Sequence, residues 1–329
     1  MSSFQEILAK IYAGTGAVPV AHLYELSDLS GSKLDAFWAD WETRPAFQRR
    51  RLITALVELA EASFQVNFDA IFIQSMGDPD EGVRAASVDG LWENEQVHLI
   101  APLLSMLRAD PSPRVREAVA ASLGRFVLAG ELEKLDASIQ QRIVAELLAT
   151  IHRAGESVDV RRRAIESASY AATPPVLEAI ELAYYDEDEA MRRSAVLGMG
   201  RSCDPRWASI LLTELESHSP AMRYEAALAS GEMMLREAVP LLARLINDPD
   251  RQVCDVAVWA LGQIGGAEAK QVLLDALEDA DEDLQIAIDE ALAELALSGG
   301  ETNFVLYEVE GIPEDDLPAW AAGGEGWPE

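Results

Sequence analysis

The sequence predicts an all-α protein, a right-handed solenoid of stacked helical hairpins. Two observations support this prediction. Nearly the same phrase, a turn followed by an amphipathic helix, returns along the chain at a regular interval. Each phrase also follows a second apolar helix, so the repeating unit is helix A, turn and helix B. One such hairpin cannot cover its own apolar face, and stacking on its neighbours covers it.

The interval can be measured between the first apolar residues of successive phrases, which we call the anchors. Their spacings are 32, 45, 31, 31, 31 and 31 residues, and the anchors are Val83, Val115, Val160, Met191, Met222, Val253 and Leu284. Apolar or small residues follow at offsets 4, 7 and 8, which share about a third of the helical circle with the anchor. Gly or Ala at offsets 7 and 9 predicts close approach of neighbouring helices, as at Gly198, Gly200, Gly231 and Gly262.

The turn between the two helices often carries Asp-Pro, as at Asp110-Pro111. Proline is tolerated at a helix start because its missing N–H would be unpaired there. The phrase from Asp110 to Gly124 closely follows the pattern D-P-x-x-x-V-R-x-x-A-x-x-A-L-G. Over residues 64–299 the chain therefore resembles the short bacterial HEAT repeats, the class first associated with phycobilisome lyases.

The resemblance implies a ladder in which each turn Asp pairs with a helix-B Arg six residues later. The expected pairs are Asp78 with Arg84, Asp110 with Arg116, and Asp186 with Arg192. We expect the ladder to fade afterwards, since Ser217 precedes Arg223 and Cys254 replaces the next Arg. These arginines are interpreted as structural, and the repeat class does not fix a function.

Residues 1–63 do not fit the phrase and are predicted to form an N-terminal helical cap, which a solenoid needs at its open end. Its expected core residues are Trp38, Trp41, Leu52, Leu56 and Leu59. We expect Arg49–Arg51 to lie on a solvated helix face. The one long spacing between anchors predicts a longer loop, or an extra helical turn, near residues 127–140.

Residues 300–329 form a predicted irregular tail with eight acids, no Lys or Arg, and two tryptophans. Such a tail either keeps the chain soluble or docks on a partner. The candidate docking motif consists of Asp315, Asp316 and Trp320.

The charge balance argues against two classes of partner. With 57 acidic and 26 basic residues, the net charge is -31. We therefore expect no unaided binding to nucleic acid and none to anionic membranes. The chain has two cysteines and shows no signal peptide or long apolar segment, so we expect a cytoplasmic protein, and a monomer.

No catalytic, metal-binding or cofactor-binding residues are predicted. None of the four histidines is followed by Glu, whereas HEAT-repeat deoxyhypusine hydroxylases hold iron through His-Glu pairs. The sequence has no HExxH, Cys-x-x-Cys or phosphate-loop motif. The preferred function is therefore a non-catalytic scaffold or adaptor that binds a protein. An accessory lyase or chaperone for a chromophore-bearing protein remains the alternative.

The concave face supplies the candidate binding residues. Helix B normally lines this face, and its offsets 2, 6 and 10 lie opposite or beside the buried stripe. In the middle repeats these columns and their flank carry arginines and large apolar side chains: Arg125, Arg162, Arg163, Tyr170, Arg193, Leu197, Arg201, Tyr224, Leu228 and Trp259. Such residues are enriched at binding hot spots. We predict a groove for an acidic, aromatic-bearing peptide, including the chain's own tail, unless the arginines pair with Glu166 and its neighbours.

Overall fold

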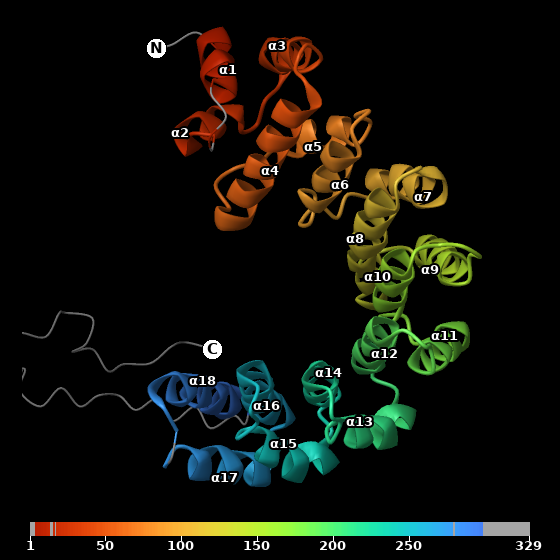
Figure 1. Cartoon of the computed structure of the whole chain (residues 1–329), viewed down its shortest axis with the longest axis vertical. Coiled ribbons are helices and arrows are strands. Elements are labelled where there is room, and N and C mark those ends of the chain that lie inside the picture. Colours follow the sequence, from red (N-terminus) through yellow and green to blue (C-terminus); the bar gives the residue numbers. More distant parts are fainter. Residues whose placement is uncertain (1–3, 14–15, 17, 279, 299–329) are drawn as a thin grey trace, which may run out of the picture.

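The computed structural model is an all-α solenoid that bends into an open arc (Figure 1). It describes residues 4–13, 16, 18–278 and 280–298, and within these ranges it contains no β-strand. The predicted fold class is confirmed. None of the helices in this part of the chain is both long and apolar enough to cross a membrane.

The helices follow one another as pairs. The N-terminal part contains α1 (Phe4–Tyr12), α2 (Val20–Leu23), η1 (Tyr24–Leu26), α3 (Gly31–Trp41) and α4 (Ala46–Ala62). The A helices are α5 (Asp69–Ser75), η2 (Val97–Leu99) with α7 (Ile100–Ala109), α9 (Ala137–Ile151), α11 (Pro174–Tyr184), η3 (Pro205–Trp207) with α13 (Ala208–Glu214), η4 (Arg236–Ala238) with α15 (Val239–Leu245), and α17 (Gly266–Ala276). The B helices are α6 (Glu81–Asp89), α8 (Pro113–Glu131), α10 (Val158–Ala168), α12 (Glu189–Ser202), α14 (Pro220–Glu232), α16 (Arg251–Ile264) and α18 (Glu282–Ser298).

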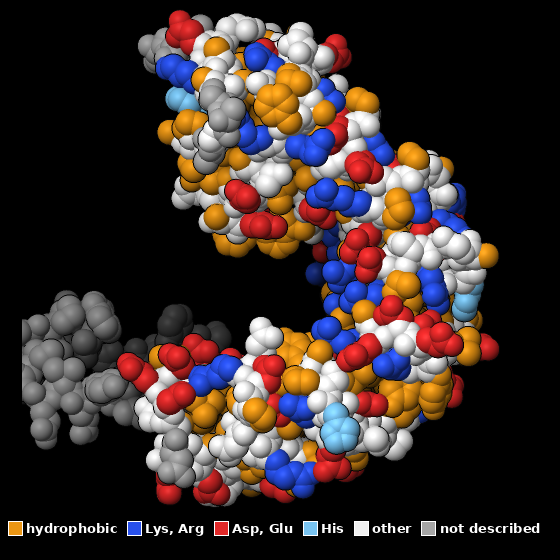
Figure 2. Space-filling view, viewed as in Figure 1, with side chains coloured by type: hydrophobic (Ala, Val, Ile, Leu, Met, Phe, Trp, Pro, Cys, Tyr) orange, Lys and Arg blue, Asp and Glu red, His pale blue; other side chains and the backbone are white. Residues whose placement is uncertain are grey.

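The B helices form the inner wall of the arc, and from α7 onward the A helices form the outer wall (Figure 1). The space-filling view shows that the inner wall encloses a deep hollow (Figure 2). Five B helices have an N-cap residue whose side-chain oxygen accepts a hydrogen bond from a backbone N–H of the first turn. This N–H would otherwise have no partner within the helix. These residues are Asp80, Ser157, Asp188, Ser219 and Asp250.

The predicted buried stripe is confirmed, because the first six anchors are at most 4% exposed. The small residues at offsets 7 and 9 bring consecutive B helices into close contact, also as predicted. A Cβ added to Gly231 would lie 2.9 Å from the Cα of Ala260, and one on Gly262 would lie 3.3 Å from the Cα of Ala291. A larger residue at either glycine would force the two helices apart.

The ladder exists, but its pairing differs from the prediction. Arg84 donates two hydrogen bonds of 2.8 Å to Asp110, the turn acid of the following repeat. Arg84 also donates to the backbone carbonyl of Asp78, the turn residue six positions earlier, at 2.9 Å, but it does not contact the Asp78 carboxylate. The predicted pairing of Asp78 with Arg84 is therefore wrong. Each such Arg closes its own turn through a carbonyl and joins the next repeat through its charge.

The same two contacts recur along the chain. Arg116 donates to the carbonyl of Asp110 and forms its ion pair with Glu156 at 2.6 Å. Arg223 donates to the carbonyl of Ser217 and pairs with Asp248 at 2.7 Å. Because Arg223 needs only the backbone oxygen of its own turn residue, Ser217 keeps this contact. Ser217 offers no carboxylate to the arginine of the preceding repeat, so the ladder loses one ion pair at this step and resumes at Arg223 with Asp248.

Arg192 is the exception among these arginines. It donates to the carbonyl of Asp186, and the described residues give it no ion pair. The predicted pair of Asp186 with Arg192 is thus a backbone contact, while the Asp186 carboxylate accepts from Arg161 of the preceding repeat at 3.3 Å. At the next position of the ladder, Cys254 donates its thiol to the Asp248 carbonyl.

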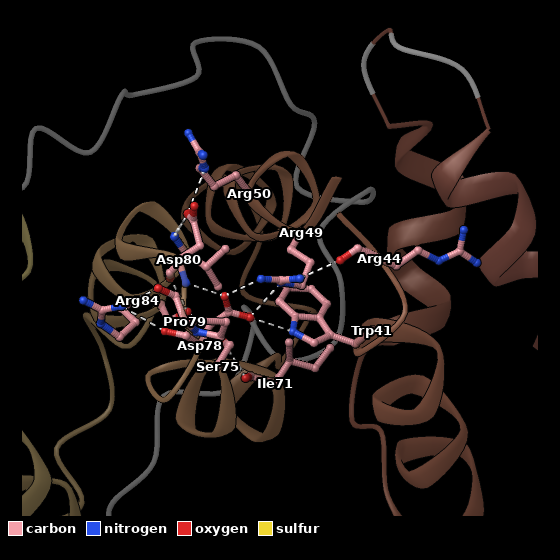
Figure 3. A network of polar contacts seen from close by, with 12 residues as sticks. Trp41, Arg44, Arg49, Arg50, Ile71, Ser75, Asp78, Pro79, Asp80 and Arg84 are labelled. Atoms are coloured by element: carbon pink, nitrogen blue, oxygen red, sulfur yellow. Dashed lines mark hydrogen bonds and ion pairs between the residues drawn. The ribbon is translucent and has the colours of Figure 1, made fainter. Parts of the chain in front are cut away.

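The ladder extends into the N-terminal part. Figure 3 shows Asp78 between Arg49 and Trp41, with the Arg49 Nη2 at 2.9 Å and the Trp41 Nε1 at 3.0 Å from its carboxylate oxygens. Arg50 pairs with Asp80 at 2.8 Å, and Arg51 donates to a carbonyl of α1. The expected solvated face is therefore wrong for Arg49 and Arg51, which are half-buried, and correct for Arg50, whose side chain is 53% exposed. The pair α3–α4 is joined to the solenoid by the same chemistry as the repeats.

The long spacing between Val115 and Val160 is mostly helical. Residues 127–131 extend α8 and residues 137–140 begin α9, so only residues 132–136 lie outside the two helices. The longer loop predicted near 127–140 is therefore wrong, and the alternative of extra helical turns is correct. The predicted tail at 300–329 lies outside the described residues.

Candidate functional site

A pocket of about 770 Å³ lies between α12, α14 and α16 and receives side chains from the predicted groove columns. Four of the ten predicted residues line it: Arg193, Tyr224, Leu228 and Trp259. Tyr224 and Trp259 belong to neighbouring repeats, at offsets 2 and 6 after their anchors. The 31-residue period therefore places two aromatic side chains on one surface.

Trp259 forms a fixed part of this pocket. Its indole lies against Gly231, since a Cβ on that glycine would come within 2.6 Å of the Trp259 Cζ3 atom. The side chain nevertheless remains 37% exposed. A tryptophan with one edge packed on a helix and one face open offers rigid apolar area at little cost in conformational entropy.

Arg193 forms one edge of the pocket and is already paired. Its Nη2 donates to Glu225 at 2.9 Å, and its Nε is buried without a partner. Burial raises the pKa of Glu225, and the Arg193 charge opposes this rise. Glu225 was not predicted from sequence, although it follows Tyr224 directly and so lies beside the groove column.

The opposite edge of the pocket is acidic. Asp250 and Asp255 line it together with Gln252, near the first turns of α16. Asp255 occupies offset 2, so the column that identified Tyr224 also contained this carboxylate. The prediction selected the basic and aromatic members of the column and left out the acid.

The central arginines of the groove converge on Glu166. Arg163 pairs with this carboxylate at 2.9 Å, and the Ser194 hydroxyl donates to it at 2.5 Å. Arg162 in turn donates to Ser194 at 3.0 Å. Glu166 is only 6% exposed, so it is a buried counter-charge. Figure 2 shows Lys and Arg side chains gathered at the deepest part of the hollow.

The remaining predicted residues serve more local contacts. Arg201 donates to the Glu166 carbonyl at 2.8 Å and lies over the ring of Tyr170, with 4.8 Å from its Cζ to the centroid. Leu197 is half-buried on α12. Arg125 donates to the Asn94 carbonyl at 2.9 Å, and burial lowers its pKa to about 10. Arg125 therefore belongs to a repeat junction and not to the pocket.

Within the described ranges, no group of three or more His, Cys, Asp and Glu side chains converges as metal ligands would. Cys203 is exposed and Cys254 is buried, and burial raises the pKa of both thiols. A raised pKa leaves less of the reactive thiolate at neutral pH.

Comparison with known proteins identifies the repeat. Residues 70–150 and 208–293, about half of the chain, match the family model of HEAT repeats. A segment of 117 residues is 31% identical to the stalled ribosome sensor GCN1 of Homo sapiens, which covers 34% of this chain and 4% of that protein. The corresponding match in Mus musculus is 28% identical over 118 residues. The chain thus spans a small fraction of these relatives.

Two solved structures also match this chain. A chain of the structure in which Kap95p binds RanGDP is 15% identical, with a TM-score of 0.51, and the match covers 89% of this chain and 45% of that chain. Human deoxyhypusine hydroxylase in complex with glycerol is 17% identical, with a TM-score of 0.35, and covers 80% of this chain and 96% of that chain.

Proposed function

The chain belongs to the HEAT-repeat family, and on that premise we propose that it is a non-catalytic adaptor that holds a segment of a partner protein on its concave face. HEAT solenoids commonly act as protein-binding scaffolds. The observation that carries the proposal is the pocket formed by Tyr224, Leu228 and Trp259. Solvent-accessible aromatic side chains in a hollow of this size are typical anchoring points for a partner.

The relatives agree with a role in binding. Kap95p, whose complex with RanGDP contains a chain of this fold, binds another protein. The second candidate function, an accessory lyase for a chromophore-bearing protein, rests on the narrower resemblance to phycobilisome lyases. No feature of the pocket specifically favours it.

The chain's own tail motif, Asp315, Asp316 and Trp320, is a second candidate occupant of the groove. It lies outside the described residues. Its acids would meet Asp255 at the edge of the pocket, and like charges repel. We therefore expect a chain that ends at Gly300 to bind its partner no more tightly than the full chain. Tighter binding by the shortened chain would identify the tail as a competitor.

Site-specific photo-crosslinking tests the proposed function. A benzoyl-phenylalanine at Tyr224 points the reactive group into the pocket, and the same group at Leu182 serves as the control. Leu182 lies on α11 in the outer wall and is 60% exposed. We expect cells to yield a crosslinked protein from the Tyr224 position alone. Equal crosslinking from both positions, or none from Tyr224, would contradict binding on the concave face.

A further inference from the structure

The C-terminal end of the concave face carries an excess of carboxylates. At the edge of the pocket, Arg251 lies between Asp255, at 2.9 Å, and Asp281, at 3.0 Å. These two carboxylates are 50% and 65% exposed, so solvent or a ligand can reach them. One arginine therefore pairs with two carboxylates at this edge. A third acidic residue, Asp250, also lines the pocket.

The excess continues on α18. Asp283 and Glu290 are both exposed, and no ion pair among the described residues involves either. Glu290 holds the position on α18 that Trp259 holds on α16, one 31-residue period earlier. Between residues 271 and 298 the chain has nine acids and no Lys or Arg. We call Asp250, Asp255, Asp281, Asp283 and Glu290 the acidic rim.

Two arginines of the groove, in contrast, already have carboxylate partners. Arg163 pairs with Glu166 and Arg193 with Glu225, at 2.9 Å in each case. At these two arginines an acidic ligand would have to compete with carboxylates that the fold has already placed. It would also meet the acidic rim as it entered the neighbouring pocket.

We propose that the concave face binds a basic segment of a partner protein. An aromatic or large apolar side chain of that segment fills the pocket between Tyr224 and Trp259, and Lys or Arg residues beside it lie over the acidic rim. The aromatic faces also favour nearby cations. The net charge of -31 attracts such a segment over distance, most strongly at low salt. This inference rests on the proposed function and specifies the chemistry of the ligand.

Two synthetic peptides test the charge of the ligand. Both carry fluorescein and a central tryptophan, which is flanked by lysines in one and by glutamates in the other. Fluorescence anisotropy with the full chain should show the lysine peptide binding at least about tenfold more tightly at low salt, with the difference falling as salt rises. Equal or tighter binding of the glutamate peptide overturns the inference.

Matched variants locate the binding. Trp259→Ala should weaken binding of the lysine peptide about tenfold, because the pocket loses an aromatic wall that contacts the peptide's tryptophan. Asp283→Asn combined with Glu290→Gln should weaken it several-fold. The control is Glu178→Gln combined with Glu181→Gln on α11 of the outer wall, which removes the same charge from exposed positions. If the control variant lost as much affinity for the lysine peptide, the net charge of the chain would explain the effect. That result would overturn the assignment of binding to the acidic rim.

The outcomes separate this inference from the proposed function. Circular dichroism first checks that every variant is folded. If crosslinking succeeds at Tyr224 while the glutamate peptide binds best, the groove binds protein and the charge assignment fails. If crosslinking fails at Tyr224 and Trp259→Ala leaves the lysine peptide unaffected, the groove itself is wrong.

Discussion

Two junctions between neighbouring repeats, α6–α8 and α12–α14, differ in the ladder contact that joins them. At α6–α8, Arg84 and Asp110 form a bidentate ion pair, and their side chains are 12% and 6% exposed. At α12–α14, the matching Arg192 has no ion pair among the described residues. Ser217 stands where the next turn acid would lie, 25 residues later.

Close packing takes the place of the ladder ion pair at α12–α14, where Arg193 and Glu225 form a separate ion pair at 2.9 Å. A Cβ on Gly200 would lie 2.7 Å from the Cα of Ala229, so α12 and α14 touch through their backbones. At α6–α8 the equivalent offset is occupied by Trp92, which lies beyond the end of α6. The comparison shows that a solenoid junction can lose its ladder ion pair where small residues bring the two helices into contact.

Ala229→Asp should have the largest effect, because it places an unpaired charge in a contact with no free space. Ala229 is fully buried. We expect a loss of about 3–5 kcal/mol in the free energy of unfolding, the usual cost of an uncompensated buried charge. Urea denaturation followed by circular dichroism measures it. Ala101→Asp, at an exposed position in the first turn of α7, is the control and should change stability little.

Asp110→Ala should cost about 2–3 kcal/mol, since it leaves the nearly buried Arg84 without its carboxylate. A double-mutant cycle identifies the partner. Asp110→Ala should couple strongly to Arg84→Ala and weakly to Arg116→Ala, because Arg116 contacts only the Asp110 carbonyl. Stronger coupling to Arg116 would restore the pairing expected from sequence and contradict the structure.

The same variant has a predictable pH dependence. Burial alone would raise the pKa of Asp110, but hydrogen bonds from Arg84 and from the Ser112 N–H outweigh it and hold the pKa below its ordinary value. The contribution of Asp110 is therefore complete above an unfolded-state pKa of about 4 and is lost as pH falls through the lower folded pKa. The wild type and Asp110→Ala should converge in stability under acid. A gap that widens as pH falls would contradict this sign.

Much of the fold follows from the period of the sequence. The anchors and the small residues at offsets 7 and 9 predicted the buried stripe and the close helix contacts correctly, because both depend on spacing along one helix. The ladder partners were wrong because the pairs cross to the next repeat, as from Arg84 to Asp110. A sequence pattern within one turn cannot distinguish a carboxylate contact from a carbonyl contact.

The site was less accessible to sequence reasoning. The offset columns brought Tyr224, Leu228 and Trp259 together, since repeats of equal length place equal offsets on one surface. Whether an arginine of the groove is free or already paired with a carboxylate depends on contacts between helices. The alternative that the arginines pair with Glu166 holds for Arg163, whereas Glu225, the partner of Arg193, was not anticipated.

Ser217→Asp should convert the α12–α14 junction toward the chemistry of α6–α8. The new carboxylate would lie where Asp110 and Asp248 lie relative to their arginines and would pair with Arg192. We expect a gain of about 1 kcal/mol, typical of a good partly buried pair. Thermal unfolding measures it. In an Arg192→Met background the same substitution should give no gain, and an equal gain there would show that the pair does not form.

Glu232→Gln should have the smallest effect, and its sign shows whether the Glu232 charge costs or adds stability at α12–α14. Glu232 lies against Gly200, and its Oε2 is buried without a hydrogen-bond partner. Burial raises the pKa of Glu232, and the charge of Arg201 opposes this rise. The carboxylate therefore costs stability at neutral pH, so the amide should stabilise the fold by less than about 1 kcal/mol.

The pH dependence completes this test. A raised folded pKa means that wild type gains stability as pH falls through it, whereas the glutamine variant has no such gain. The advantage of Glu232→Gln should therefore shrink toward acidic pH in parallel urea titrations. Glu290→Gln, an exposed carboxylate on α18, should show no comparable change. If Glu232→Gln instead destabilised the chain at neutral pH, the Glu232 carboxylate and Arg201 would stabilise the junction together, in addition to the ion pair of Arg193 with Glu225.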